Sequence, residues 1–246
     1  MPYWSHDSGG FSGTPSDDLY LRWAQFGALS PLVRFHGTTS RLPWDFPPDA
    51  QRYATEAIRL RYRLMPYLYS VAVESARTGL PMLRALLVDS PDDPAAWTAE
   101  LEYRLGPDLL VAPVLDPTGR RHVYLPAGAW VDHWTGEVHE GGRHLRISAP
   151  LDRLPLFVRY GALIPVAPVR DTVGDGPFDD ITVVSWGGTS GRTVIRDVDG
   201  DTTVDAVRTG DTLRVEVTGP APVRRVEVVG GADTVRIVLN GRALTP

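Results

Sequence analysis

Two short segments near the start of the chain contain the residue types that bind hydroxylated or charged ligands. Residues 4–11 read WSHDSGGF, and residues 30–37 read SPLVRFHG. In both, apolar residues lead to charged or polar ones, and glycine follows. Carboxylate, guanidinium and imidazole groups exchange hydrogen bonds, and parallel barrel strands present such groups where the chain passes into a loop. We therefore predict that Asp7, Arg34 and His36 lie at neighbouring strand ends.

The segment between these two strands has the pattern of an amphipathic helix. Ser16 is a favourable N-cap residue, and the acidic Asp17 and Asp18 follow it in the first turn. Apolar residues then recur every three or four positions up to Gly27, which predicts one apolar face. The order is therefore strand, glycine loop, helix, strand. On residue types alone, exposed surface loops explain the histidine and the aspartate equally well.

The motifs in this region decide between these interpretations. The pattern WSHDxGGF at residues 4–11 is followed by RWxxFG at 22–27, RxHG at 34–37 and PW at 43–44. This succession resembles the last two barrel strands of glycoside hydrolase family 31, the retaining α-glycosidases that include α-glucosidases and α-xylosidases. The similarity is closest to the α-xylosidase branch.

The resemblance assigns roles to individual residues. It implies that Asp7, Phe11 and His36 line the pocket for the non-reducing sugar. Arg34 points along the same side of its strand as His36, and we expect it to form a structural ion pair with Asp7. His6 is expected to support the pocket from behind. Position 8 carries Ser8 where the family usually has isoleucine, which affects local packing rather than the pocket residues.

The resemblance also implies that the reacting carboxylates lie elsewhere. Retaining glycosidases use two carboxylates about 5 Å apart, one as nucleophile and one as acid/base. In the family both belong to barrel strands that precede the motif at residues 4–11. We therefore expect this chain to be the C-terminal portion of such an enzyme, with no catalytic residue of its own, inactive alone and partnered by the missing N-terminal part of the barrel.

Composition excludes several other classes of protein. The 246 residues are 43% hydrophobic, which allows a sizeable core, and the net charge of −5 argues against a nucleic-acid partner. All basic residues other than histidine are arginines. With no cysteine, there are no disulfides and no thiolate chemistry. No apolar run reaches membrane-spanning length and no signal peptide is visible, so we predict no membrane partner and a cytoplasmic location.

The pattern of the remaining chain predicts a fold class that combines α/β and all-β parts. Residues 1–79 are expected to form the end of a (β/α)8 barrel, with one long helix from about 49 to 78 that Pro66 kinks. Residues 80–168 and 169–246 are expected to form two small antiparallel β-sandwiches, separated by a run of Pro, Gly and Asp at 167–177. The expected strands cover residues 109–114, 122–126, 129–134, 154–159, 181–184, 213–217, 223–228 and 235–239.

Three other groups of polar residues favour ordinary structure over a site. Asp92 and Asp93 lie between prolines, which is typical of a solvated turn. His133, His139 and His144 have no recognised zinc spacing. Residues 197–201 (DVDGD) imitate a calcium loop, but the glycine and the twelfth residue do not fit. We therefore predict no metal and no cofactor.

Two hypotheses about function follow. The first is an enzyme: the chain belongs to a retaining α-glycosidase whose carbohydrate substrates are α-xylosides or α-glucosides. Under this hypothesis a homo-oligomer is one of the open states of assembly. The second is a non-catalytic carbohydrate-binding or scaffold module formed by the sandwiches. An exposed aromatic platform among Trp130, Trp134 and Trp186 favours the second. The sharpest motifs lie in the barrel region, which favours the first.

Overall fold

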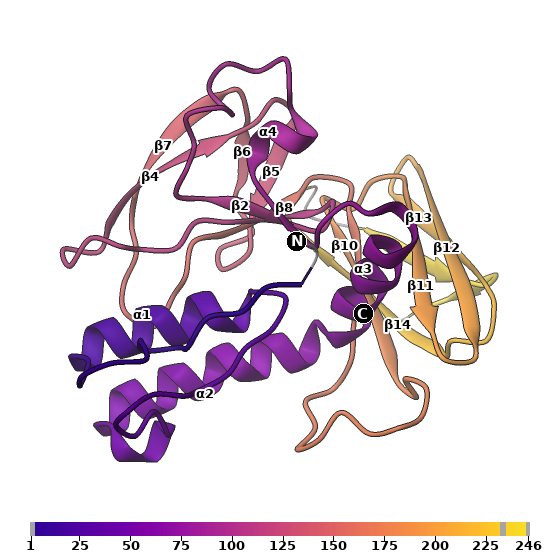
Figure 1. The fold of residues 1–246 in the computed structure, drawn as a ribbon. Helices are drawn as coiled ribbons and strands as arrows, with labels where there is room; N and C mark the ends of the chain where they lie inside the picture. The colour runs from indigo at the N-terminus through magenta and orange to yellow at the C-terminus, as the bar shows by residue number, and fades with distance from the viewer. Residues whose placement is uncertain (1–2, 232–234, 245–246) are drawn as a thin grey trace.

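The N-terminal part of the chain is helical. The computed structural model describes residues 3–231 and 235–244 (Figure 1). Helix α1 (Asp17–Ala28) begins where the sequence predicted, because the Ser16 hydroxyl accepts a hydrogen bond from the backbone N–H of Leu19 at 3.4 Å. A short 3-10 helix, η1 (Pro43–Asp45), precedes α2 (Pro48–Arg63), which lies alongside α1 in Figure 1.

The expected long helix is two helices. Helix α2 ends at Arg63, Leu64 forms the junction, and α3 (Met65–Thr78) follows at an angle (Figure 1). The break lies before Pro66, which occupies the first turn of α3, the place where a missing N–H costs least. The prediction of one helix that Pro66 kinks was therefore wrong, because the helix ends and the break falls two residues earlier, at Leu64. Gly79, in the left-handed conformation at φ 79°, ends α3.

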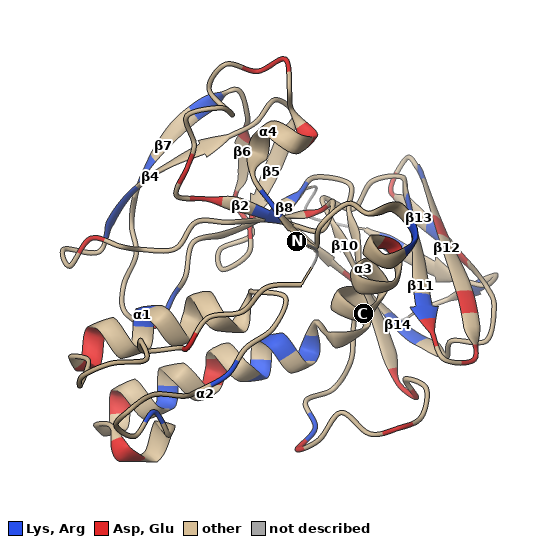
Figure 2. Cartoon of the chain, in the orientation of Figure 1, with Lys and Arg blue, Asp and Glu red and all other residues tan. Residues whose placement is uncertain are grey.

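The charged face of α2 behaves as a solvated surface. Arg52 forms an ion pair with Asp49 at 2.9 Å, and Arg59 pairs with Glu56 at 2.8 Å. All four side chains are more than half exposed, and Figure 2 shows the charges distributed along the helix. Exposed pairs of this kind contribute little to stability and do not form a binding patch.

The two expected barrel strands are reduced to one contact. Asp7 and Arg34 form a single parallel β-bridge. Among the described residues, these two segments are not joined by a β-ladder of more than this one bridge. The parallel direction agrees with the predicted arrangement. Barrel strands are held by hydrogen-bonded neighbours on both edges, and each of these segments has only the other as a described neighbour, so the pairing stops at the bridge.

The middle part of the chain forms an antiparallel β-structure. A six-stranded sheet has the order β1-β2-β3-β8-β5-β6, and a separate two-stranded ribbon joins β4 to β7. All pairs in this part are antiparallel, as the sequence predicted. The elements are β1 (Leu83–Arg84), α4 (Leu86–Asp89), β2 (Tyr103–Leu105), β3 (Leu109–Val111), β4 (Arg120–Leu125), β5 (Ala129–Asp132), β6 (Val138–Glu140), β7 (Arg143–Ser148) and β8 (Leu156–Arg159).

The last part of the chain contains two sheets, of orders β14-β10-β9 and β11-β12-β13-β15-β16. Here the prediction of a purely antiparallel sandwich was wrong, because β10 pairs with β14 and β13 pairs with β15 in parallel. Strand β9 precedes the expected boundary at residue 168 and pairs with β10 beyond it. The elements are β9 (Leu163–Val166), β10 (Ile181–Trp186), β11 (Gly191–Asp197), β12 (Gly200–Thr209), β13 (Thr212–Thr218), β14 (Val223–Val229), β15 (Arg236–Leu239) and β16 (Arg242–Ala243).

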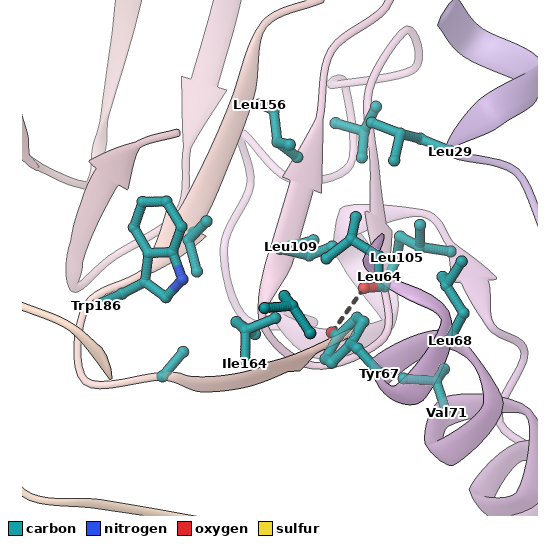
Figure 3. Packing of buried hydrophobic residues seen from close by; sticks show 14 of the residues in the cluster. Leu29, Leu64, Tyr67, Leu68, Val71, Leu105, Leu109, Leu156, Ile164 and Trp186 are labelled. Atoms are coloured by element: carbon teal, nitrogen blue, oxygen red, sulfur yellow. Dashed lines mark hydrogen bonds between the residues drawn. The ribbon is translucent and has the colours of Figure 1, made fainter. Parts of the chain in front are cut away.

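One hydrophobic core joins the three parts of the chain (Figure 3). It combines Leu64 and Leu68 at the α2–α3 junction with Leu109 of the middle sheet and Trp186 of β10. The Tyr67 hydroxyl, buried in this core, donates to the carbonyl of Leu105 at 2.9 Å (Figure 3). Burial of this apolar surface fixes the helices against both sheets. Within the described ranges, no helix has the length and apolar character needed to cross a bilayer.

Candidate functional site

Asp7 and Arg34 form the centre of the candidate site. The backbone N–H of Ser8 donates to the carbonyl of Arg34 at 3.0 Å, which fixes the two segments side by side. The Arg34 Nε lies 2.5 Å from the Asp7 Oδ1. The Asp7 side chain is 14% exposed, whereas that of Arg34 is 63% exposed. The carboxylate is therefore held in place by a cation that itself faces solvent.

His36 and Phe11, which follow the two paired segments in the chain, lie together. Their ring centroids are 5.5 Å apart and the planes are inclined by 43°. Both side chains are exposed. The backbone N–H of Thr38 donates to the carbonyl of Phe11 at 2.7 Å, which joins the loop after the first segment to the loop after the second. An aromatic face, an imidazole and a carboxylate thus lie on adjacent segments, a combination able to bind a hydroxylated ring.

His6 is held in one tautomer behind the site. Its Nδ1 accepts a hydrogen bond from the Trp23 indole at 2.8 Å, so the proton is on Nε2, 3.1 Å from the Ser30 hydroxyl. That hydroxyl donates to the carbonyl of Phe26 at 2.9 Å. Burial lowers the pKa of His6, and the Asp7 carboxylate partly opposes the shift. His6 is therefore a neutral, stacked support next to Asp7.

Arg22 and Gln25 of α1 fix this helix to the loop between β7 and β8. The Arg22 guanidinium donates to the carbonyls of Ala149, Pro150 and Arg153, at 2.7 to 3.1 Å. Gln25 adds a bond to the carbonyl of Leu151 at 2.7 Å. These contacts join residues more than 120 positions apart, so α1 is fixed to the middle part of the chain while its other face supports His6.

Ser8 is an unfavourable residue at a crowded position. Its side chain is fully buried, and the hydroxyl has no hydrogen-bond partner within residues 3–231 and 235–244. A Cβ built on Gly27 of α1 lies 2.3 Å from this oxygen, which explains why α1 has glycine there. A buried hydroxyl without a partner loses its hydration and gains nothing in return.

Ser8→Ala is expected to raise the free energy of unfolding by about 1 kcal/mol, because it removes the unpaired hydroxyl and leaves the packing nearly unchanged. Urea unfolding of the chain measures this. Ser30→Ala is the matched control: its hydroxyl bonds to His6 and to Phe26, so its removal is expected to lower stability. A loss of stability in both variants contradicts the prediction.

Arg41 is a residue that the sequence analysis did not identify. Its side chain is 2% exposed, and the guanidinium donates to the loops that follow Asp7 and His36. Arg61 was missed in the same way and donates to the carbonyls of Ala28, Ser30 and Pro31 at the C-terminal end of α1. The only signal for Arg41 is its place two residues before the PW pair at 43–44.

The other candidate groups have structural roles. His133 stacks on Trp186 at 5.4 Å, His139 packs edge-on against Phe157, and His144 lies beside Tyr124. Asp201 pairs with Arg196 and Arg77 at the hairpin that joins β11 and β12. In the part of the chain that the structure describes, no three His, Cys, Asp or Glu side chains form a group that could hold a metal ion.

The structure does not provide the aromatic platform that would favour a binding module. Trp130 is 2% exposed and Trp186 is 5% exposed, and both belong to hydrophobic cores. Trp134 is 38% exposed, with its indole N–H donating to the carbonyl of Leu154 at 2.7 Å. The three indoles thus do not form a common exposed face.

Comparison with known proteins gives the family. The profile described as the "Glycosyl hydrolases family 31 TIM-barrel domain" matches residues 1–71, and the "Glycosyl hydrolase family 31 C-terminal domain" matches residues 79–164. The chain belongs to glycoside hydrolase family 31. Together the two matches cover the candidate site, α1, α2, the first half of α3 and the middle sheet, which agrees with the motifs found in the sequence.

Relatives of this family 31 chain include proteins named α-xylosidase and α-glucosidase. The α-xylosidase of Saccharolobus solfataricus is 38% identical over 210 residues, which cover 82% of this chain and 29% of the relative. The α-glucosidase 2 of Bacillus thermoamyloliquefaciens is 37% identical over 238 residues, covering 94% and 29%. The chain thus spans about three tenths of the length of these relatives.

Solved structures give the same result for the fold. The α-xylosidase of Xanthomonas citri superposes with a TM-score of 0.79 at 30% identity, covering 94% of this chain and 29% of that one. A dextranase of Flavobacterium johnsoniae, solved with isomaltotriose, has a TM-score of 0.79 at 29% identity, covering 85% and 29%. The arrangement of helices and sheets is therefore that of family 31 enzymes.

Proposed function

We propose that this chain supplies the sugar-binding end of the barrel of a retaining α-glycosidase that acts on α-xylosides or α-glucosides. The observation that carries the proposal is the parallel bridge between Asp7 and Arg34, which brings the Asp7 carboxylate beside the segment that ends in His36. Parallel barrel strands form sites at this end. The relatives named α-xylosidase and α-glucosidase support the substrate class.

Each residue of the site has a defined part in this proposal. The Asp7 carboxylate accepts hydrogen bonds from sugar hydroxyls, and the ion pair with Arg34 holds it in orientation. His36 accepts a hydrogen bond from another sugar hydroxyl, and Phe11 forms one wall against the ring. Hydrogen bonds to the sugar are most valuable when they strengthen as the oxocarbenium-like transition state develops.

The proposal assigns the chemical step to residues outside this chain. Nucleophilic attack at the anomeric carbon and protonation of the leaving oxygen need two carboxylates about 5 Å apart. The ion pair with Arg34 suits Asp7 to a binding role rather than to that of nucleophile or acid/base. We assign both reacting aspartates to the upstream part of the barrel.

A pair of proteins tests the proposal. The first is this chain alone, and the second is a fusion in which the upstream part of the Saccharolobus solfataricus α-xylosidase precedes this chain. We expect the fusion to hydrolyse nitrophenyl α-xyloside or α-glucoside and the chain alone to show no rate above a buffer blank. Hydrolysis by the chain alone contradicts the assignment of the carboxylates, and a folded but inactive fusion contradicts the proposed function.

A further inference from the structure

Arg41 connects the two loops that carry the sugar-binding residues. Its Nε and Nη2 donate to the carbonyl of Gly10 at 3.0 and 2.7 Å, and Nη2 also donates to Gly13 at 2.9 Å. Its Nη1 donates to the carbonyls of Thr39 and Ser40, each at 3.0 Å, and to the Thr39 hydroxyl. The first loop contains Phe11, and the second directly follows His36.

The charge of Arg41 makes this connection rigid. No carboxylate lies within ion-pair distance of the guanidinium among the residues that the structure describes. A buried cation is tolerated only when its donors reach oxygens, so displacement of either loop leaves N–H groups without partners in a place that water does not reach. The planar fork matches carbonyls on two sides at once, which a lysine ammonium cannot do.

Gly9 of the first motif and Gly37 of the second lie so close to the Arg41 side chain that neither position has room for a Cβ atom. A Cβ on Gly9 lies 2.8 Å from the Arg41 Cδ, and a Cβ on Gly37 lies 2.9 Å from its Cζ. The backbone of both loops therefore packs directly on the Arg41 side chain. The Arg41 backbone is fixed in turn, because the Tyr20 hydroxyl donates to its carbonyl at 3.1 Å. The contact thus has a support that is independent of the loops.

We propose that Arg41 is a positioning residue that sets the distance between Phe11 and His36, and so the width of the sugar pocket. It does not contact the sugar. Its effect passes through the loop carbonyls and the bond from the Thr38 N–H to the Phe11 carbonyl at 2.7 Å. The inference rests on the proposed function for the identity of the ligand, whereas the connection between the loops is independent of it.

Hydrogen exchange of the chain tests the connection itself. In Arg41→Lys we expect amides of residues 8–14 and 36–42 to exchange about tenfold faster than in the unmodified chain, because local opening of the loops becomes easier. Arg22→Lys is the matched control, since Arg22 also donates to three backbone carbonyls, but these belong to residues 149–153 and not to either of the two loops. Unchanged exchange in Arg41→Lys, or equal acceleration in Arg22→Lys, overturns the proposal.

Kinetics of the fusion test the consequence for catalysis. We expect Arg41→Lys to lower kcat by about 10- to 100-fold with little change in KM, because a displacement of about 1 Å is costly in the transition state. Arg22→Lys is expected to keep kcat within about twofold, since it alters stability rather than pocket geometry. Methylguanidinium added to Arg41→Ala, but not to Arg22→Ala, is expected to restore part of kcat. Equal losses in the Arg41 and Arg22 variants overturn the positioning role.

A milder variant covers the case in which Arg41→Lys does not fold. The Thr39 hydroxyl accepts from Arg41 and donates to the carbonyl of Gly13 at 2.8 Å. Thr39→Val removes both bonds at an exposed position and is expected to accelerate exchange in the same peptides by at least threefold. No acceleration in this variant overturns the proposal. If the unmodified fusion lacks activity, the proposed function fails, while the exchange experiment still decides whether Arg41 joins the loops.

Discussion

His36→Ala, made in the fusion that carries this chain, is expected to lower kcat by about 10²-fold while KM changes by less than about threefold. His36 follows a segment that is paired with Asp7, and the centroid of its ring lies 5.5 Å from the centroid of the Phe11 ring. An imidazole nitrogen held in this way can accept a hydrogen bond from a sugar hydroxyl at a fixed position. Positive charge that develops in the sugar ring makes that hydroxyl a better donor, so the bond strengthens and its loss falls on the transition state.

His122→Ala is the matched control for this experiment. His122 is an exposed histidine of β4, in the ribbon that β4 forms with β7, and its replacement is expected to leave both constants unchanged. A rise in KM with an unchanged kcat means that His36 binds substrate and transition state equally. If neither constant moves, His36 has a structural role and the pocket assignment is wrong.

The sequence predicted local structure well where one residue type determines it. Ser16 followed by two aspartates marked the start of α1, and Gly79 marked the end of α3. The short strands of the middle part were predicted from their bounding glycines and prolines, since turn chemistry is local. The direction of strand pairing is not local, which is why the parallel pairs of β10 with β14 and of β13 with β15 were missed.

The site could be predicted only in part for a related reason. Asp7, Phe11 and His36 were found because charged and aromatic residues next to glycine are conspicuous in a sequence. Arg41 looks like any other arginine of a chain that has no lysine. Its burial depends on two loops that fold over it. The periodicity of apolar residues in the sequence does not predict such a contact. Whether these residues bind sugar stays a prediction.

Two titratable groups, the buried Glu102 and the half-buried His133, are expected to give the chain opposing dependences of stability on pH. Burial raises the pKa of Glu102 to about 7 from an ordinary value of 4.5, opposed by the bond from the Tyr124 N–H and by Arg121. Burial lowers the pKa of His133 to about 4 from 6.5, with Asp132 opposing the shift and Arg63 adding to it. Neither group belongs to the proposed site.

The signs follow from which state binds more protons. Between pH 4.5 and 7 the folded state holds the Glu102 proton more tightly than the unfolded chain, so its contribution to stability falls as the pH rises through about 7. Between pH 4 and 6.5 the unfolded chain protonates His133 more readily, so stability falls as the pH drops through this range. Across its pH range, each group changes the free energy of unfolding by about 3 kcal/mol. The two changes have opposite signs, so they largely cancel where the two pH ranges overlap.

Single variants are therefore expected to reveal the pH dependence of stability that each group causes, because the opposing group no longer cancels it in the comparison. Glu102→Gln keeps an oxygen for the Tyr124 N–H and removes the titration, so its stability relative to the unmodified chain is expected to rise by about 3 kcal/mol from pH 4.5 to 7.5. His133→Phe keeps an aromatic ring against Trp186, and its relative stability is expected to rise by about 3 kcal/mol as the pH falls from 7 to 4. Urea unfolding followed by tryptophan fluorescence at each pH measures both differences. Because all other titrating groups are common to the compared proteins, difference curves that stay flat with pH would show that these two side chains titrate normally in the folded chain.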